Sequence, residues 1–209
     1  MSSKPNNTRE TVGIFPTAMQ MSMMPDAANL NKELMREIQK IRKSTPNGKP
    51  SSWASSVYTT LFTNAQLHKN PVFKPLADFI LSEAVAFGKT LGIDQGRYEM
   101  DFKDCWFNIY GYKDGQEVHD HKNSIISGSY YVRTPRGAAG LTVYSPVMDT
   151  MYIPPQIENN IYNTEFDEIF VEEGLIVLFR SNLKHSVKPN PIHKDRISIS
   201  FNFNMHRRF

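Results

Sequence analysis

The segment Arg196-Ile-Ser-Ile-Ser-Phe-Asn-Phe203 alternates strictly between polar and apolar residues. Successive side chains of a β-strand point to opposite faces, so this alternation predicts a strand with one polar and one apolar face. The polar face carries Arg196, Ser198, Ser200 and Asn202. The apolar face predicts burial in a core. A polar face headed by an arginine is typical of a strand that lines a cavity for an anionic ligand, because a guanidinium pairs well with a carboxylate. A polar face in contact with solvent is the alternative.

Sequence patterns typical of β-strands extend over the second half of the chain. From residue 97 onward, short runs rich in β-branched and aromatic residues are separated by Gly, Pro, Asn and Asp. These runs cover residues 98–102, 105–112, 125–134, 141–144, 169–171, 175–180 and 196–205. Their spacing predicts an antiparallel sandwich or barrel and argues against a βαβ fold. Residues 145–167 contain several Pro and Asn residues and are too many for a tight turn, so they are predicted to form a lid.

The first half of the chain predicts elements that support this β-core. They are a strand at residues 11–24, a helix at 27–43 and a second helix from Pro71 or Pro75 to about residue 91. Both helices are indicated by apolar residues spaced three or four positions apart. Because no linker divides the chain, we expect a single domain over residues 1–209. Residues 97–209 would form its core, and residues 1–96 would support that core.

Composition and charge narrow the function classes. The 209 residues include 24 Lys and Arg and 21 Asp and Glu, which gives a net charge of +3. Charges of both signs are interspersed, so charge gives little support for nucleic-acid binding. No apolar run approaches the length of about 18 residues that a membrane span needs. The N-terminus lacks the apolar stretch of a secretory signal, and one cysteine, Cys105, fits a reducing compartment; both features predict a cytoplasmic protein.

Three histidines of the β-rich half suggest a metal site. In Glu117-Val-His-Asp-His121 two imidazoles are separated by one residue, and on an extended strand they would share a face. Two neighbouring imidazoles form a chelate for a borderline metal ion. His185 follows the apolar run 175–179, and in a sandwich this distant strand end can lie beside the first pair. A chance His-x-His pair and a surface His185 are the alternative.

Two parts of the chain resemble the Fe(II)- and 2-oxoglutarate-dependent dioxygenases. The first combines Trp106-Phe-Asn-Ile-Tyr-Gly111 with Val118-His-Asp-His-Lys-Asn-Ser-Ile-Ile-Ser-Gly-Ser-Tyr-Tyr-Val132. The second combines Gly174-Leu-Ile-Val-Leu-Phe-Arg-Ser-Asn-Leu-Lys-His-Ser-Val187 with residues 196–202. The pattern His-x-His-x-x-Ser-x-x-Ser-Gly-x-Tyr-Tyr is similar to that of a small oxygenase clade of bacteria and phages. Prolyl 4-hydroxylases show a similar Tyr-Tyr strand and the same pair of strands that carry the distal histidine and the arginine. The resemblance implies a mainly β fold, a double-stranded β-helix or jelly-roll core of the cupin type, backed by N-terminal helices.

The resemblance also implies a set of metal ligands. His119 would be the first iron ligand and His185 the distal one. The superfamily usually places Asp or Glu two residues after the first histidine, where this chain has His121. We therefore expect a site of three histidines. Its three neutral ligands leave the ion one charge more positive, which could shift the preference from Fe(II) toward Zn or Ni.

A second set of residues is implied as the co-substrate site. Arg196 would form a salt bridge with the far carboxylate of 2-oxoglutarate, and Ser198 would donate a hydrogen bond beside it. Tyr110 or Tyr130 would supply a phenol to the same carboxylate, and Asn108 would be a further contact. Asn108 and Tyr110 share one face of their predicted strand.

The implied activity is hydroxylation of a substrate by O2, with conversion of 2-oxoglutarate to succinate and CO2. The likeness to prolyl 4-hydroxylases makes a peptidyl proline or another protein side chain the first expectation, and a small-molecule substrate stays open. One alternative is a non-catalytic, cupin-like module that binds a metal or ligand. Another is an oxygenase that modifies nucleic acid through basic residues of the first helix and of the C-terminal tail. The first helix packs on the core or forms a homodimer contact, and the sequence leaves both open.

Overall fold

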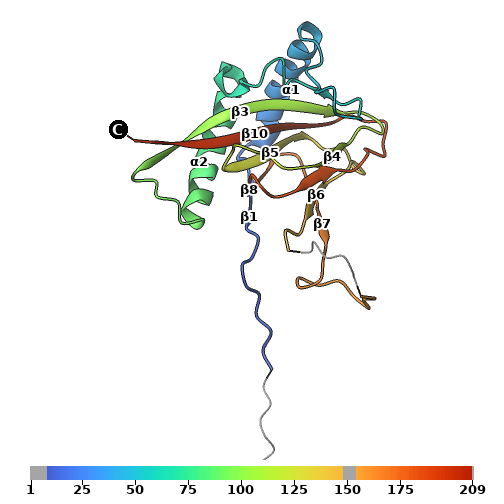
Figure 1. Ribbon diagram of the computed structural model, residues 1–209. Helices are drawn as coiled ribbons and strands as arrows, with labels where there is room; N and C mark the ends of the chain where they lie inside the picture. The colour runs from blue at the N-terminus through green and yellow to red at the C-terminus, as the bar shows by residue number, and fades with distance from the viewer. Residues whose placement is uncertain (1–8, 148–153, 209) are drawn as a thin grey trace, which may run out of the picture.

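Two antiparallel β-sheets face each other at the centre of the computed structural model, which describes residues 9–147 and 154–208 (Figure 1). The larger sheet has the strand order β1-β8-β5-β10-β3-β2 within the described residues, and the smaller has the order β4-β9-β6-β7. The strands of the larger sheet are β1 (Met19–Met23), β2 (Tyr58–Thr59), β3 (Tyr98–Tyr110), β5 (Ile126–Arg133), β8 (Leu175–Arg180) and β10 (Arg196–Arg207). Those of the smaller sheet are β4 (Gln116–His119), β6 (Leu141–Tyr144), β7 (Phe166–Ile169) and β9 (His185–Val187). The predicted mainly β architecture is confirmed.

Strand β10 lies between β5 and β3 and separates the core from the space between the sheets. Its apolar residues belong to the main hydrophobic core; they are Ile197, Ile199, Phe201 and Phe203. Its opposite, polar face begins with Arg196 and points away from that core, as the alternation predicts. The sequence therefore assigns the two faces of β10 correctly.

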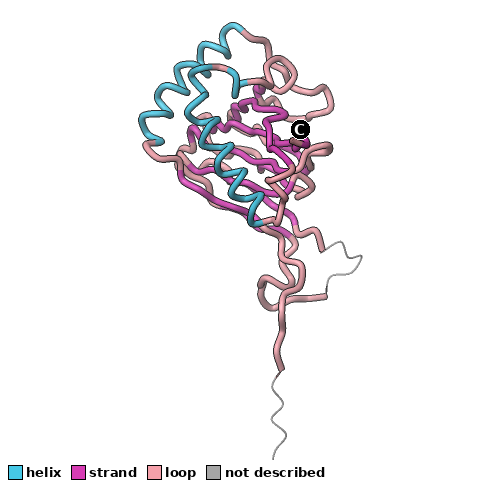
Figure 2. The backbone as a smooth tube through the Cα atoms, turned by 90° about the vertical axis from the view of Figure 1, so that its left-hand side faces the viewer, coloured by secondary structure: helices cyan, strands magenta, loops and turns pink. Residues whose placement is uncertain are grey.

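Helices α1 (Ala27–Ser44) and α2 (Lys74–Thr90) cover the apolar side of the larger sheet (Figure 2). Helix α1 buries Leu34, Ile38 and Ile41, which recur at the spacing that predicted it. Two short 3-10 helices, η1 (Leu67–Lys69) and η2 (Pro71–Phe73), lead into α2. None of the described helices is long and apolar enough to cross a membrane.

Several strands differ from the predicted runs. The runs at 98–102 and 105–112 form one continuous strand, β3, because the interruption between them is a β-bulge rather than a turn. The expected strand at 11–24 is reduced to β1, and residues 9–17 extend away from the body (Figures 1 and 2). Strand β7 forms at Phe166–Ile169, earlier than the predicted run at 169–171.

The predicted lid, residues 145–167, contains residues 148–153, which lie outside the described residues. The described part after this gap extends beside the N-terminal arm, where the Tyr162 hydroxyl donates to the Thr11 carbonyl oxygen at 3.3 Å. None of the described residues between 145 and 167 lines the cavity between the sheets. The role of this segment as a lid stays a prediction.

Candidate active site

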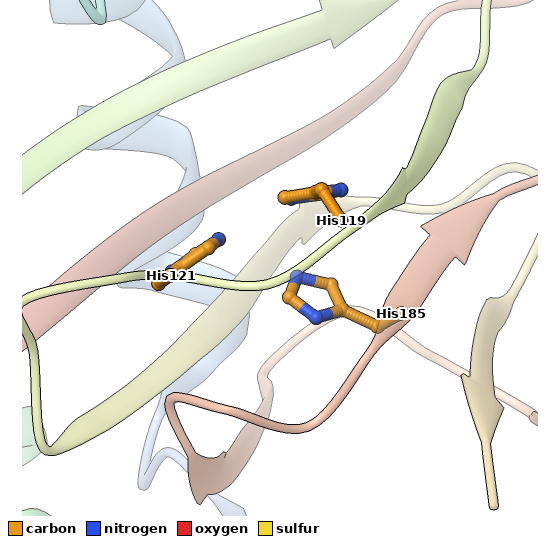
Figure 3. A group of neighbouring side chains, drawn as sticks. All are labelled: His119, His121 and His185. Atoms are coloured by element: carbon orange, nitrogen blue, oxygen red, sulfur yellow. The ribbon is translucent and has the colours of Figure 1, made fainter. Parts of the chain in front are cut away.

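Three histidines converge at one edge of the smaller sheet (Figure 3). His119 ends β4, and His185, its direct partner in the ladder, begins β9. His121 lies beyond the end of β4, and its main-chain N–H donates to the Ser181 carbonyl oxygen at 2.8 Å. One nitrogen of each ring lies within 4.8 Å of one nitrogen of both others. The three histidines named from the sequence therefore lie close together, but the two imidazoles of the His-x-His pair do not share a strand.

The hydrogen bonds of the three rings leave one nitrogen of each available to a metal ion. Nδ1 of His119 is 2.8 Å from the Glu117 carbonyl oxygen, and Nδ1 of His185 is 2.8 Å from the Leu183 carbonyl oxygen. Nδ1 of His121 is 2.5 Å from the Asn202 side-chain oxygen. Carbonyl oxygens only accept, so each Nδ1 carries the hydrogen and each Nε2 keeps its lone pair. Three imidazole donors so close together fit a divalent transition-metal ion.

Burial lowers the pKa of all three histidines. The pKa of His185 is lowered to about 3, first by burial and then by repulsion from His119 and His121. The pKa of His121 is lowered to about 4, first by burial and then by His119. Burial also lowers the pKa of His119. At neutral pH the rings are therefore uncharged, which is the form that binds a metal ion.

Asp120 does not join this cluster. Among the described residues, the group whose ligand atoms come within reach of one ion consists of His119, His121 and His185 alone. Asp120 lines the same cavity, but no ring nitrogen of the cluster is hydrogen-bonded to its carboxylate. The centre therefore presents three neutral donors, as the sequence predicts.

The histidines line a cavity of about 240 Å³ between the two sheets, and Arg196 lies in its wall. The arginine side chain is almost fully buried, with 1% of its surface exposed. Its Nε donates to the Ala139 carbonyl oxygen at 2.8 Å, and its guanidinium carbon lies 5.0 and 5.1 Å from the ring centroids of Tyr110 and Tyr131. Its Nη1 has no hydrogen-bond partner among the described residues. The cavity thus contains a positive charge with a free donor.

Tyr131, and not Tyr130, is the tyrosine of β5 that faces this cavity. The hydroxyl of Tyr130 points into the core, where it donates to the side-chain oxygen of Asn31 at 2.6 Å. The buried hydroxyl of Tyr131 has no partner among the described residues. The prediction of Tyr130 is therefore corrected. The alternation of β5 contained the signal, because Ser127 and Ser129 share the face of Tyr131.

The other predicted co-substrate residues lie where the sequence places them. Ser198, Asn108 and Tyr110 all line the cavity. The side-chain amide of Asn108 is already engaged: its Nδ2 donates to Ser200 Oγ at 3.1 Å, and its Oδ1 accepts from Trp106 Nε1 at 3.2 Å. Asn108 therefore holds the cavity wall in place. Burial raises the pKa of Tyr110 to about 12, so its phenol stays protonated.

Sequence reasoning missed both tryptophans. The chain has two, Trp53 and Trp106, and both line the cavity. Large aromatic residues most often fill a core, so their type alone gave no signal. Trp53 comes from a loop of the first half of the chain, and its place depends on tertiary packing against Tyr110 and Val187.

Comparison with known proteins relates the residues of this site to a protein family. Residues 104–202 match the family model described as "Putative 2OG-Fe(II) oxygenase". This match spans every residue assigned to the site from sequence. Over these residues, slightly less than half of the chain, the protein matches the 2OG-Fe(II) oxygenases. The match indicates an oxygenase, an enzyme whose cofactors are Fe(II), 2-oxoglutarate and O2. A search of curated proteins found no match.

Solved structures show the fold of this oxygenase. A prolyl-4-hydroxylase of Pseudomonas putida is 13% identical, with a TM-score of 0.61 over 92% of this chain and 94% of that chain. A prolyl hydroxylase of Trichoplax adhaerens is 14% identical, with a TM-score of 0.63 over 88% of this chain and 82% of that one. HygX of Streptomyces hygroscopicus is 10% identical, with a TM-score of 0.59 over 90% and 83%. These likenesses confirm the double-stranded β-helix core.

The lowered histidine pKa values predict how the stability of the metal-free oxygenase depends on pH. An unfolded histidine titrates near its ordinary pKa of about 6.5, whereas these three stay neutral to lower pH. Below about pH 6.5 the unfolded chain therefore binds more protons, and the free energy of unfolding falls as the pH drops toward 4. We expect His185→Asn to make this decrease shallower. Urea unfolding of chelator-treated wild type and His185→Asn between pH 7.5 and 4.5 measures the free energy of unfolding of each protein. Equal slopes of this free energy against pH would contradict the lowered pKa of His185.

Proposed function

We propose that this oxygenase hydroxylates a C–H bond of its substrate and converts 2-oxoglutarate to succinate and CO2. One observation carries the proposal. A single cavity presents three convergent imidazole nitrogens and, in its wall, a buried guanidinium with an unused donor. The first group suits a divalent ion, and the second suits a carboxylate.

His119, His121 and His185 would hold the iron. Bound Fe(II) with 2-oxoglutarate supplies the oxidation of a C–H bond by O2. The contribution of the protein is to orient the three ligands, since each ring is tied down through Nδ1. The strand pair β4–β9 fixes two of these rings relative to each other.

Arg196 would bind the far carboxylate of 2-oxoglutarate. Burying a charge without a partner is costly, and the described residues provide this guanidinium with a carbonyl oxygen and two aromatic faces but no carboxylate. A dicarboxylate in the cavity would remove this cost. The phenols of Tyr110 and Tyr131 flank the guanidinium, and burial raises the pKa of both, so they stay protonated and can donate.

The substrate would be a side chain of a peptide, with proline as the first candidate. The cavity is small, and where it reaches the surface its lining includes the partly exposed Trp53 and Leu61 and the exposed Lys122. Such a mouth suits a single side chain presented from a larger molecule. The structural likeness to two prolyl hydroxylases supports this choice; one of them was solved with a peptide fragment of the oxygen degradation domain of hypoxia inducible factor.

Replacing Arg196 tests the co-substrate site. Arg196→Met keeps the length and packing of the side chain but removes the charge. Loss of a buried charge-assisted pair costs about 2–4 kcal/mol, so 2-oxoglutarate should bind about 30- to 1000-fold more weakly. Anaerobic titration with Fe(II) and then 2-oxoglutarate, followed by the visible charge-transfer band, measures this. His185→Ala should lose the iron itself. Unchanged co-substrate affinity in Arg196→Met would exclude the assignment.

Two adjacent tyrosines of β5 provide a matched pair. Tyr131→Phe removes a donor from the cavity and should weaken 2-oxoglutarate binding about tenfold, as expected for a hydrogen bond to a charged group. Tyr130→Phe removes the bond to Asn31 and should lower the free energy of unfolding by about 1 kcal/mol with unchanged 2-oxoglutarate affinity. Isothermal titration and urea unfolding of both variants separate the two roles. Equal effects of the two substitutions on 2-oxoglutarate binding would contradict the assignment.

The substrate class is tested with peptides. Short peptides that contain proline in varied sequence contexts, and the same peptides with alanine in its place, are incubated with the iron-loaded enzyme, 2-oxoglutarate and O2. We expect some proline peptides to gain one oxygen atom by mass spectrometry and to stimulate succinate formation. Succinate formation without oxygen transfer to any peptide would refute the peptidyl substrate while leaving the co-substrate chemistry intact.

A further inference from the structure

His121 is held differently from the other two histidines. His119 and His185 belong to paired strands, whereas His121 follows the end of β4 and is anchored through its main-chain N–H to Ser181. Nδ1 of His119 and of His185 donates to a main-chain carbonyl oxygen. Nδ1 of His121 instead faces two side chains, Asn202 Oδ1 at 2.5 Å and Ser127 Oγ at 3.0 Å. The orientation of this ring therefore depends on side chains.

The orientation of the Asn202 amide is determined by Asp104. The two residues lie directly opposite each other on β10 and β3, and Asn202 Nδ2 donates to Asp104 Oδ2 at 3.2 Å. An ionised carboxylate can only accept, so the amide nitrogen must face Asp104 and the amide oxygen must face His121. Ser127 supports this orientation, because its hydroxyl donates to Asn202 Oδ1 at 2.8 Å.

The same logic determines the tautomer of His121. The amide oxygen of Asn202 is an acceptor, so the hydrogen of the neutral ring must be on Nδ1. Nε2 then keeps its lone pair. The charge of Asp104 thus decides, through one intervening amide, which nitrogen of His121 can bind a metal ion. A neutral residue at position 104 would let the amide turn, and either tautomer would then find a partner.

Asp104 also brings a negative charge to a site that otherwise has neutral ligands. Within the described residues it is the carboxylate that a path of side-chain hydrogen bonds joins to the ring of His121. Its side chain is 28% exposed and its Oδ2 lies 3.9 Å from Lys103 Nζ, so burial opposes its negative charge only weakly. Hydrogen bonds behind a ligating histidine orient the ring and raise its basicity.

We propose that Asp104 and Asn202 are positioning residues that hold His121 as the Nδ1–H tautomer and place a negative charge behind this ligand. The first part of this proposal, the tautomer of His121, depends only on the geometry of the protein. The charge part rests on the proposed function, since it requires that the three histidines hold a metal ion.

The tautomer is measured first, without metal. Long-range proton–nitrogen NMR spectra of the chelator-treated protein at pH 7.5 distinguish a ring protonated at Nδ1 from one protonated at Nε2. Wild-type His121 should be the Nδ1–H form, and Asp104→Asn should shift its nitrogen resonances toward a mixture of both forms. Asp101→Asn, the same change at an exposed position of β3, should leave them unmoved. Identical His121 resonances in wild type and Asp104→Asn would overturn the proposal.

Metal affinity is measured second, with Co(II) as the probe. Loss of such a supporting contact typically costs about 10- to 100-fold in affinity, so Asp104→Asn should bind Co(II) at least about tenfold more weakly and show a changed visible spectrum. The double variant Asp104→Asn/Asn202→Asp should recover most of the affinity, because the carboxylate introduced at position 202 accepts from His121 directly. A merely structural role would give no such rescue, and its absence would overturn the charge part. A wild type that fails to bind Co(II) would instead reject the proposed function, while the NMR result would still decide the tautomer.

Discussion

The pleat of β10 is the constraint on which both the core and the cavity depend. Successive side chains of a strand point to opposite faces. The isoleucines and phenylalanines of β10 therefore pack in the core beneath the helices, and its polar residues, Arg196 to Asn202, line the space between the sheets. The strand is paired on both sides, with β3 and β5, so it cannot rotate to exchange these faces. One fixed alternation therefore stabilises the fold and supplies both a guanidinium at one end of the cavity and an amide at the other.

Sequence segments with a clear hydrophobic period formed the elements that were predicted for them. The faces of β10, the apolar stripe of α1 and the location of β8 were all readable, because each contains enough residues for a period to show. The same period predicts that Tyr131 shares a face with Ser127 and Ser129. The choice of Tyr130 came from the motif rather than from the alternation of the strand, and for this reason it was wrong.

The features that the sequence did not reveal depend on which strands pair in the folded protein. Strands β4 and β9 are very short, so neither has a detectable period, yet their pairing brings His119 and His185 together. The three histidines were predicted from their residue types, but the stated reason failed for His121, which no strand carries. The link from Asp104 to His121 requires the register of β3 against β10, next to a bulge that sequence alone does not locate.

Both indole rings of this chain lie in the wall of a single cavity, and the Trp106 ring centroid is 6.0 Å from that of His121. All of the tryptophan fluorescence of the protein therefore originates beside the site. An ion or a small molecule that enters the cavity would alter an emission to which no distant tryptophan contributes. The site thus contains its own optical reporter, and ligands can be screened on the unlabelled protein.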